Sequence, residues 1–357
     1  MNNILRISDF ELRAKEVLTT MAWEYLGSAA GDELTLKWNI TAFDRIQFLP
    51  RVLNDVSELD TSVELFGERL PHPVMLAPVA YHKLFHKNGE IESAKGAALA
   101  ESVYCVSTMT NTSIEEIAQS SPQTRLWYQL YVQRDRGYTK NIIERVEAAG
   151  AKAIVVTVDT PVLGNRVREA RAGFHLPDGL NRAMLEGLPK EFQIIGHDTD
   201  LQGIYYPLCD PKLSWKDIEW IVQTATVPVV LKGILHPDDA DIAIQSGAQG
   251  VIVSNHGARN LDTVPPTIEM LPDIVDRIDG EIPVLFDGGI RRGTDILKAM
   301  ALGASAVMVG RPYVWGLAVQ GAAGIEKAVS LLLTEMKIAM ALCGRARLSE
   351  VDEGILL

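Results

Sequence analysis

Residues 283–312 read PVLFDGGIRRGTDILKAMALGASAVMVGRP. The stretch begins with a short apolar run of strand length, passes through a glycine-rich turn into a segment with helical patterning, and ends in a second apolar run. A continuous apolar run without alternating polar residues is typical of a parallel strand that is covered on both faces. The stretch therefore predicts a strand–helix–strand unit of a parallel α/β fold.

The same unit recurs along the chain. Eight apolar runs are candidate strands, at 73–78, 103–108, 125–131, 153–159, 228–233, 250–255, 283–288 and 306–310. Segments with helical patterning separate most of them, at 89–102, 113–119, 137–150, 214–225, 236–247, 268–279 and 293–303, and several carry the expected capping residues. Eight such units predict an α/β fold of the closed (β/α)₈ (TIM) barrel type in a single domain. A doubly wound open sheet is the alternative, and it fits eight consecutive units less well.

Three segments lie outside the repeating units. Residues 8–50 predict a helical preamble, and residues 312–357 predict C-terminal helices. Residues 160–214, after the fourth strand, are too long for an ordinary connection and mix Gly, Pro and charged residues, so we expect a mobile lid or an oligomer contact there.

Composition limits the classes of function. The 34 basic and 46 acidic side chains give a net charge of −12, which argues against a nucleic-acid partner. Cys105, Cys209 and Cys343 are far apart and odd in number, so neither a disulfide framework nor a cysteine metal pair is expected, and a cytoplasmic location is favoured. The charged N-terminus does not resemble a signal peptide, and no run of about 18 apolar residues predicts a membrane helix.

The C-terminal ends of the candidate strands carry polar or small residues. In a (β/α)₈ barrel these ends meet at one end of the barrel, where the active sites of such enzymes lie. Each of these side chains could have a purely structural role by itself, but together they indicate a site. These residues are Pro78, Ala80, Ser107, Thr108, Gln129, Tyr131, Thr157, Asp159, Lys232, Ser254, Asn255, His256, Asp287, Gly288, Gly289, Gly310 and Arg311.

The last two strand ends favour a phosphate site. Gly288 and Gly289 precede Arg291, and Gly310 precedes Arg311. Glycines let backbone N–H groups approach an oxyanion, and arginine donates to phosphate in a bidentate manner. Two tight turns with surface arginines are the structural alternative.

His256 and Arg259 favour acid–base chemistry on a small anion. Asp159, at another strand end, could orient the imidazole and favour its protonated form. Arg259, with Arg166 as a second arm, could hold a substrate carboxylate beside His256. A phosphate site near Lys232 indicates either pyridoxal phosphate or a flavin mononucleotide (FMN). Polar side chains suited to a heterocycle edge, Ser107, Gln129 and Thr157, favour the flavin.

Several long motifs resemble those of the FMN-dependent α-hydroxy-acid oxidase and dehydrogenase family, which includes glycolate, lactate and mandelate oxidases. They are SNHGARNLD (254–262), DGGIRRGTDILKAMALGASAVMVGRP (287–312), APVAYHKLFHKNGE (77–90), YQLY (128–131), TVDTPVLGNRVRE (157–169) and AWEYLGSAAGDE (22–33). The resemblance covers nearly the whole chain, and the family fold is a (β/α)₈ barrel.

The resemblance implies a role for each matching residue. His256 is the expected base with Asp159 as its partner, and Arg166, Arg259, Tyr25 and Tyr131 are expected to contact the substrate. Lys232 is expected to lie near the flavin N1–C2 carbonyl. The other residues expected to contact FMN are Pro78, Val79, Ala80, Ser107, Gln129, Thr157 and Ser254 around the ring, Asp287 at the ribityl chain, and Gly288, Gly289, Arg291, Gly310 and Arg311 around the phosphate.

The resemblance also implies a reaction. An (S)-2-hydroxy acid is oxidised to a 2-oxo acid while FMN is reduced, the α-hydrogen leaving as a hydride or as a proton, and O₂ is the expected acceptor, giving H₂O₂. Ala80 stands where family oxidases tend to carry alanine. A dehydrogenase with another acceptor, a flavin-dependent isomerase on a related barrel and an inactive scaffold are the alternatives. A homotetramer is the expected assembly.

Three positions depart from the family pattern. Asn260 stands where the family usually has Gln, and Tyr81 follows the flavin-contacting PVA. Met109 stands where glycolate oxidases carry a substrate-facing Trp, and a flexible apolar side chain there could admit a bulkier substrate or fill the core.

Overall fold

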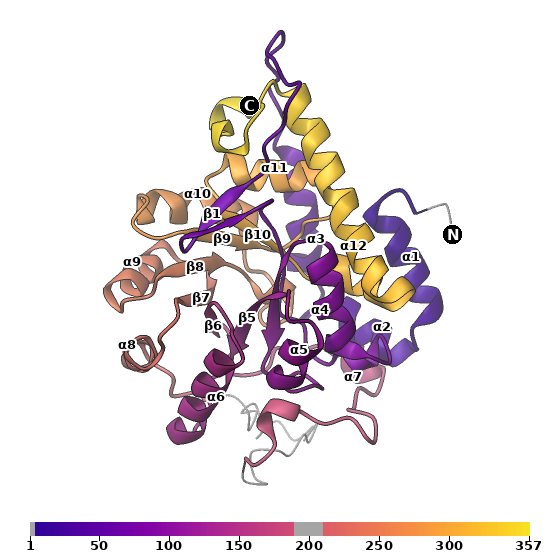
Figure 1. Ribbon diagram of the computed structural model, residues 1–357, viewed down its shortest axis with the longest axis vertical. Coiled ribbons are helices and arrows are strands. Elements are labelled where there is room, and N and C mark those ends of the chain that lie inside the picture. The colour runs from indigo at the N-terminus through magenta and orange to yellow at the C-terminus, as the bar shows by residue number, and fades with distance from the viewer. Residues whose placement is uncertain (1–3, 189–209) are drawn as a thin grey trace.

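The computed structural model describes residues 4–188 and 210–357 of the chain. Eight parallel strands close into a barrel, as predicted, and Figure 1 shows the helices arranged around it. Almost every strand residue is buried, because the strands have side chains of the barrel interior on one face and helices on the other. The strands are β3 (Val74–Leu76), β4 (Val103–Ser107), β5 (Arg125–Leu130), β6 (Ile154–Thr157), β7 (Val229–Ile234), β8 (Gly250–Val253), β9 (Val284–Asp287) and β10 (Ala306–Val309).

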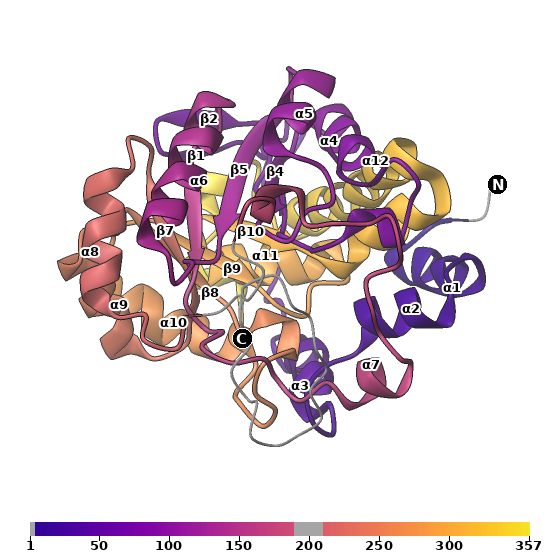
Figure 2. The ribbon, with the colours of Figure 1, turned by 90° about the horizontal axis from the view of Figure 1, so that it is seen from below.

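A helix follows each barrel strand and covers the outside of the barrel (Figure 2). Local capping fixes where several of these helices begin: the Ser113 side chain accepts from the backbone N–H of Glu116, and Asp135 accepts from that of Tyr138. The helices are α4 (Gly89–Leu99), α5 (Ile114–Ser120), α6 (Arg136–Ala148), α8 (Trp215–Thr224), α9 (Pro237–Gln245), α10 (Thr267–Ile278), α11 (Gly293–Ala301) and α12 (Arg311–Leu342).

Helix α12 is much longer than the other barrel helices. The sequence predicted C-terminal helices in this region but no membrane helix, whereas in the described part of the chain α12 is the one helix whose length and composition would allow it to cross a membrane. Its backbone leaves helical geometry at Gln320 and Gly321, and it packs against α1, α4 and α11. Packing of this kind is typical of a core helix in a globular protein.

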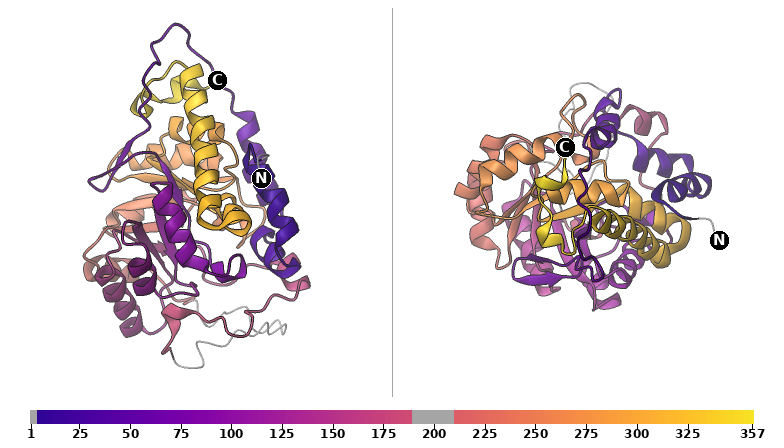
Figure 3. Two further views of the ribbon diagram at one scale, coloured as in Figure 1. Left: turned by 45° about the vertical axis from the view of Figure 1, so that its right-hand side comes forward. Right: turned by 90° about the horizontal axis from the view of Figure 1, so that it is seen from above.

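The N-terminal segment is helical, with α1 (Ile7–Val17), α2 (Thr20–Gly27) and α3 (Leu34–Thr41). Figure 3 shows α1, in indigo, beside the yellow α12, and the two helices contact each other. At the other end of the chain, α12 is followed by two short 3₁₀ turns, Leu348–Glu350 and Glu353–Ile355.

A hairpin of two three-residue strands, β1 (Val63–Leu65) and β2 (Glu68–Leu70), precedes the barrel and was not predicted. Three residues are too few to show a clear alternation, which is why the sequence pattern missed them. Leu65 and Leu70 pack against interior side chains of the barrel such as Trp127 and Met308. The hairpin therefore completes the apolar interior of the barrel.

The long segment after β6 contains helix α7 (Val167–Arg171) and a 3₁₀ turn at Ala183–Leu185. Residues 189–209, with Cys209, lie outside the described residues, so the expected lid or oligomer contact stays a prediction.

Candidate active site

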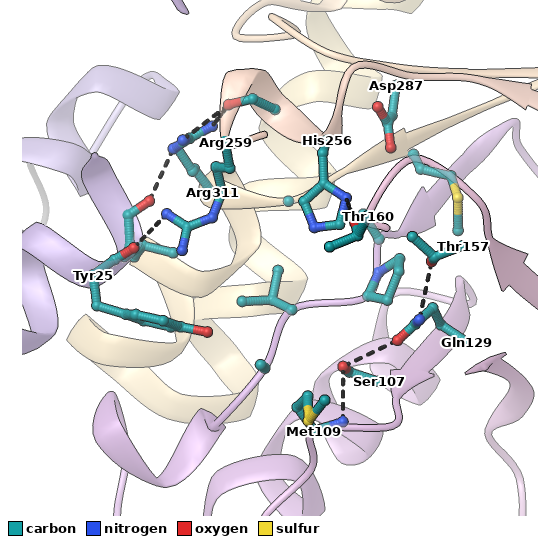
Figure 4. A pocket seen from close by; sticks show the side chains of 18 of the residues that line it. Tyr25, Ser107, Met109, Gln129, Thr157, Thr160, His256, Arg259, Asp287 and Arg311 are labelled. Carbon is teal, nitrogen blue, oxygen red and sulfur yellow. Dashed lines mark hydrogen bonds between the residues drawn. The ribbon is translucent and has the colours of Figure 1, made fainter. Parts of the chain in front are cut away.

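A cavity opens at the C-terminal ends of the barrel strands, where the sequence predicted the site (Figure 4). All but four of the predicted site residues line it: Tyr25, Pro78, Val79, Ala80, Ser107, Met109, Gln129, Tyr131, Thr157, Arg166, Lys232, His256, Arg259, Asp287, Gly288, Gly289, Arg291, Gly310 and Arg311. The four exceptions are Thr108, Asp159, Ser254 and Asn255. Three of them hydrogen-bond to residues that line the cavity: Thr108 to Gln129, Asp159 to His256 and Ser254 to Lys232.

The ends of β4, β5 and β6 form one wall of hydrogen-bonding side chains. Strand register places Ser107 opposite Gln129, and the amide of Gln129 bridges two hydroxyls. Its Oε1 accepts from the Ser107 Oγ at 3.2 Å, and its Nε2 donates to the Thr157 Oγ1 at 2.9 Å (Figure 4). These bonds fix the orientation of the amide, so the wall presents a defined edge to a polar ring.

Lys232 is a buried cation in the next strand. Register places it opposite Thr157, and its Nζ lies 2.7 Å from the Asp287 Oδ2 and 2.7 Å from the Ser254 Oγ. Burial opposes the charge, but the carboxylates of Asp287 and Asp159 outweigh it and raise the pKa of Lys232. Lys232 is therefore a fixed positive charge, and Ser254 supports it from behind instead of lining the cavity.

His256 lies in a strained loop. His256, Gly257 and Ala258 have φ values of 58°, 61° and 65°, a left-handed region that His and Ala rarely adopt. Two bonds hold the loop: the His256 N–H donates to the Ser254 Oγ, and the Ala258 N–H donates to the Asn255 Oδ1. Strain of this kind persists only where surrounding contacts enforce it, and here it directs the imidazole into the cavity.

Asp159 orients the imidazole, as predicted. The His256 Nδ1 lies 2.8 Å from the Asp159 Oδ1, and the Nε2 lies 3.4 Å from the Tyr131 hydroxyl. Donation from Nδ1 to the carboxylate leaves the Nε2 lone pair toward the cavity. Asp159 favours the protonated imidazole, as expected, but burial acts in the opposite direction, is the larger effect, and leaves the pKa of His256 lowered. A neutral imidazole is the form that can accept a proton.

Two residues that the sequence reasoning did not assign hold Asp159 in place. The Thr160 Oγ1 donates to the Asp159 Oδ1 at 2.9 Å, and the Asn260 Nδ2 donates to the same oxygen at 3.1 Å and to the Asp159 backbone O at 2.8 Å. Gly233 makes room, since a Cβ there would lie 2.5 Å from that of Asp159. Asn260 thus has a structural reason to carry an amide. Adjacency of Thr160 to Asp159 was the signal available in the sequence.

Arg259 and Arg166 share one carboxylate. The Arg259 Nη2 lies 3.0 Å from a Glu169 oxygen, and the Arg166 Nη1 lies 3.7 Å from the same oxygen. The Arg259 Nη1 donates to the backbone oxygens of Tyr25 and Ser28. Among the described residues the Arg259 Nε–H and one Nη2–H have no partner, so they can still bind an anion. Glu169, three residues after Arg166, is a further residue that the sequence reasoning missed.

Arg291 and Arg311 are both partly buried cations, and no carboxylate of the described chain lies within ion-pair distance of either. Arg311 donates to the backbone oxygens of Leu26, Ser28 and Gly257, and burial, with the nearby Arg259 and Arg291, lowers its pKa to about 9. Arg291 lies 5.0 Å above the Trp315 ring, and burial lowers its pKa as well. Because only one Arg291 donor has a partner in the described chain, Arg291 is the better placed of the two to bind phosphate.

Comparison with known proteins identifies the family. A family model described as FMN-dependent dehydrogenase matches residues 14–357. The chain belongs to this FMN-dependent dehydrogenase family. It is 42% identical to human 2-hydroxyacid oxidase 1 over 353 residues, covering 98% of this chain and 95% of that protein. It is 43% identical to an L-lactate oxidase of Nostoc sp. over 362 residues, covering 99% and 98%.

Solved structures of the FMN-dependent dehydrogenase family agree with the fold. A mandelate oxidase variant with (S)-mandelic acid superposes with a TM-score of 0.90 at 38% identity, covering 99% of this chain and 98% of that one. A mandelate oxidase with (S)-2-phenylpropionate gives a TM-score of 0.89 at 39% identity, with the same coverage.

The cavity fits FMN, the cofactor of the family. Asp287 keeps one buried oxygen, Oδ1, without a hydrogen-bond partner in the described structure, which suits a sugar hydroxyl. At Gly310 an added Cβ would meet only ordinary contacts, 3.8 Å from Val79, so no neighbouring protein atom excludes a side chain there and the space is left for a ligand. At Gly289 the backbone of Asn39 does require glycine, because a Cβ would lie 1.9 Å from the Asn39 backbone O. Arg291 would hold the FMN phosphate, since all but one of its side-chain donors have no partner in the described chain.

Proposed function

We propose that the protein oxidises a small (S)-2-hydroxy acid to the corresponding 2-oxo acid, with dioxygen as the electron acceptor and H₂O₂ as the second product. The observation that carries the proposal is His256, oriented by Asp159 and facing a cavity that it shares with Arg259. Bound FMN supplies a two-electron acceptor. The names of the relatives, which are 2-hydroxyacid and L-lactate oxidases, support this substrate class and dioxygen as acceptor.

The arginines position the substrate. Its carboxylate binds the free donors of Arg259, with Arg166 as the second cation, and a bidentate arrangement fixes the α-carbon relative to His256. Tyr25 forms the wall beside them, with the Arg259 guanidinium 5.0 Å from its ring centroid. Burial raises the pKa of Tyr25, so its hydroxyl remains a proton donor to a substrate oxygen.

His256 moves the proton. Its Nε2 accepts the proton of the substrate hydroxyl as the carbon is oxidised, and Asp159 stabilises the imidazolium that forms. Burial opposes ionisation of Asp159, but the charge of the protonated His256, the hydrogen bond from its Nδ1–H and the charge of Lys232 lower the pKa of Asp159, so the carboxylate is charged once the proton has moved. Lys232 provides a fixed positive charge for the electron-rich reduced cofactor.

Anaerobic mixing of the purified holoenzyme with L-lactate, glycolate, (S)-mandelate and longer 2-hydroxy acids tests the proposal. We expect at least one of them to bleach the flavin absorbance, and air to restore it with one H₂O₂ per turnover. Bleaching that only an artificial acceptor reverses would indicate the alternative, a dehydrogenase. Failure of every 2-hydroxy acid to bleach the flavin would refute the proposal and favour an isomerase of related fold.

We also propose a cytoplasmic homotetramer. Buried, unpaired Cys105 and Cys343 support a reducing compartment. Exposed apolar side chains, Leu53, Leu342 and Leu357, support self-association. Light scattering coupled to gel filtration tests the assembly, and a monomer at micromolar concentration would refute it.

A further inference from the structure

One cation of the cavity has neither an assigned anion nor a partner for each buried donor group. Lys232 has Asp287, Arg259 and Arg166 share Glu169, the phosphate is assigned to Arg291, and Arg311 is bonded to backbone oxygens. Arg182, from the turn after α7, also lines the cavity, and no carboxylate of the described chain lies within ion-pair distance of it. Its Nη2 is buried without a hydrogen-bond partner among the described residues. A buried guanidinium nitrogen without a hydrogen-bond partner costs free energy unless a ligand accepts its hydrogen bond.

Arg182 is held in place by the surrounding chain. The Asn111 side chain donates to the backbone oxygen of Asn181, and the Ala183 N–H donates to the backbone oxygen of Thr110. The Arg182 Nε donates to the Tyr81 hydroxyl at 2.9 Å, and the guanidinium lies 5.7 Å from the Tyr81 ring centroid. These contacts on both sides fix the guanidinium at the cavity wall.

Tyr81 offers a second donor beside it. Its hydroxyl oxygen accepts the Arg182 proton, and its own proton has no acceptor among the described residues. Tyr81 has a strained φ of 60°, and its N–H donates to the Met109 backbone oxygen at 3.1 Å. Enforced strain at a cavity wall is typical of functional positions. The Arg182 Nη2–H and the Tyr81 O–H together suit the two oxygens of a carboxylate.

An aromatic wall separates this pair from the first carboxylate site. Tyr25 lies under Arg259, stacks on Phe174 at 4.4 Å between ring centroids, and lies 5.8 Å from Tyr81. A ligand that reaches from Arg259 to Arg182 therefore passes along apolar rings and needs an anion at each end.

We infer that the substrate is a 2-hydroxy dicarboxylic acid whose distal carboxylate binds Arg182 and Tyr81. The inference rests on the proposed function and adds the substrate class. Methylene groups between the two carboxylates pack against Tyr25 and Phe174, while the hydroxyl carbon stays beside His256.

Catalytic efficiency (kcat/KM) with matched substrates tests the inference. The substrates are (S)-malate, (S)-2-hydroxyglutarate and (S)-2-hydroxyadipate, each paired with the amide of its distal carboxylate, which keeps the shape and removes the charge. We expect at least one diacid to exceed its amide by about tenfold or more, as a charge-assisted pair should. The ratio falls toward one in Arg182→Gln, falls less in Tyr81→Phe, and is largely kept in Arg182→Lys. Exposed Arg171, in the same segment, gives the control Arg171→Gln, which keeps the wild-type ratio.

Binding of the 2-oxo products gives a readout that does not depend on turnover. Calorimetric titration of the holoenzyme with 2-oxoglutarate and with its distal amide should show the same preference, lost in Arg182→Gln. A wild-type ratio near one for all three pairs, or a preference that persists in Arg182→Gln, would overturn the inference. Both results leave flavin bleaching intact, whereas bleaching by no 2-hydroxy acid would instead refute the proposed function.

Discussion

Replacing Asp159 with Asn separates the charge of this residue from its shape. In the structure the Asp159 Oδ1 accepts from His256, Thr160 and Asn260, whereas Oδ2 is buried without a hydrogen-bond partner in the described chain. An asparagine oxygen at the Oδ1 position can accept the same three bonds, with its NH₂ at the Oδ2 position. Asp159→Asn therefore keeps the imidazole in place and removes the negative charge beside it.

The size of the effect follows from the hydrogen bond that changes. A bond to a charged group contributes about 1.5–3 kcal/mol and one between neutral groups about 0.5–1.5 kcal/mol. Stabilisation of the protonated His256 therefore falls by about 1–2 kcal/mol, which slows proton removal by about 5- to 30-fold. Stopped-flow measurement of anaerobic flavin bleaching at saturating substrate reports this step directly.

Asp135→Asn is the matched control for this variant. Asp135 caps helix α6 at an exposed position, and asparagine is an equally good cap, so we expect the wild-type rate. A rate for Asp159→Asn within twofold of the wild type would refute the role of the charge. A fall as large as that of His256→Ala would show that position, not charge, is what Asp159 contributes.

Four further outcomes are expected. His256→Ala should bind FMN normally, by its visible spectrum, and reduce it about 100- to 10,000-fold more slowly; near-normal reduction would show that another group is the base. Gly233→Ala, at φ 114° and in contact with Asp159, should lower the free energy of unfolding in urea by about 1–3 kcal/mol and also slow reduction. Because burial lowers the pKa of His256 below its ordinary 6.5, the bleaching rate should fall as the pH drops, with a midpoint below pH 6.5; a midpoint above 6.5 would contradict the assigned direction. Burial also lowers the pKa of His82, so the unfolded chain binds a proton at higher pH than the folded one, and the melting temperature should begin to fall as the pH drops below 6.5, less steeply in His82→Gln.

The barrel could be predicted from the sequence because its strands are buried on both faces. Burial forces each strand to be apolar throughout, so eight runs are visible without alignment or structure. The hairpin of β1 and β2 was not predicted, because each strand has three residues and only one of them, Leu65 or Leu70, is buried. Helix α12 was expected only as C-terminal helices from residue 312, since its single apolar face is spread over a kink at Gly321.

The site could be predicted to the extent that strand ends determine it. Parallel register brings Ser107 beside Gln129 and Thr157 beside Lys232, so reading the strand ends collects most of the cavity. Contacts made by loops are not readable in this way. Arg311 is surrounded by backbone carbonyls because α2 packs against the loop after β8. No local sequence pattern predicts that these two segments meet.

Two opposing effects act on the charge of His256. A carboxylate beside an imidazole was expected to favour its protonated form, and Asp159, in contact at 2.8 Å, does raise the pKa of the imidazole. Burial acts on the same ring in the opposite direction and outweighs the carboxylate before substrate binds. Once the substrate proton reaches Nε2, the ring is charged and Asp159 is the nearest compensation. Burial thus keeps the base free in the resting enzyme, and Asp159 stabilises it after the proton has moved, so the two effects favour successive stages of one proton transfer.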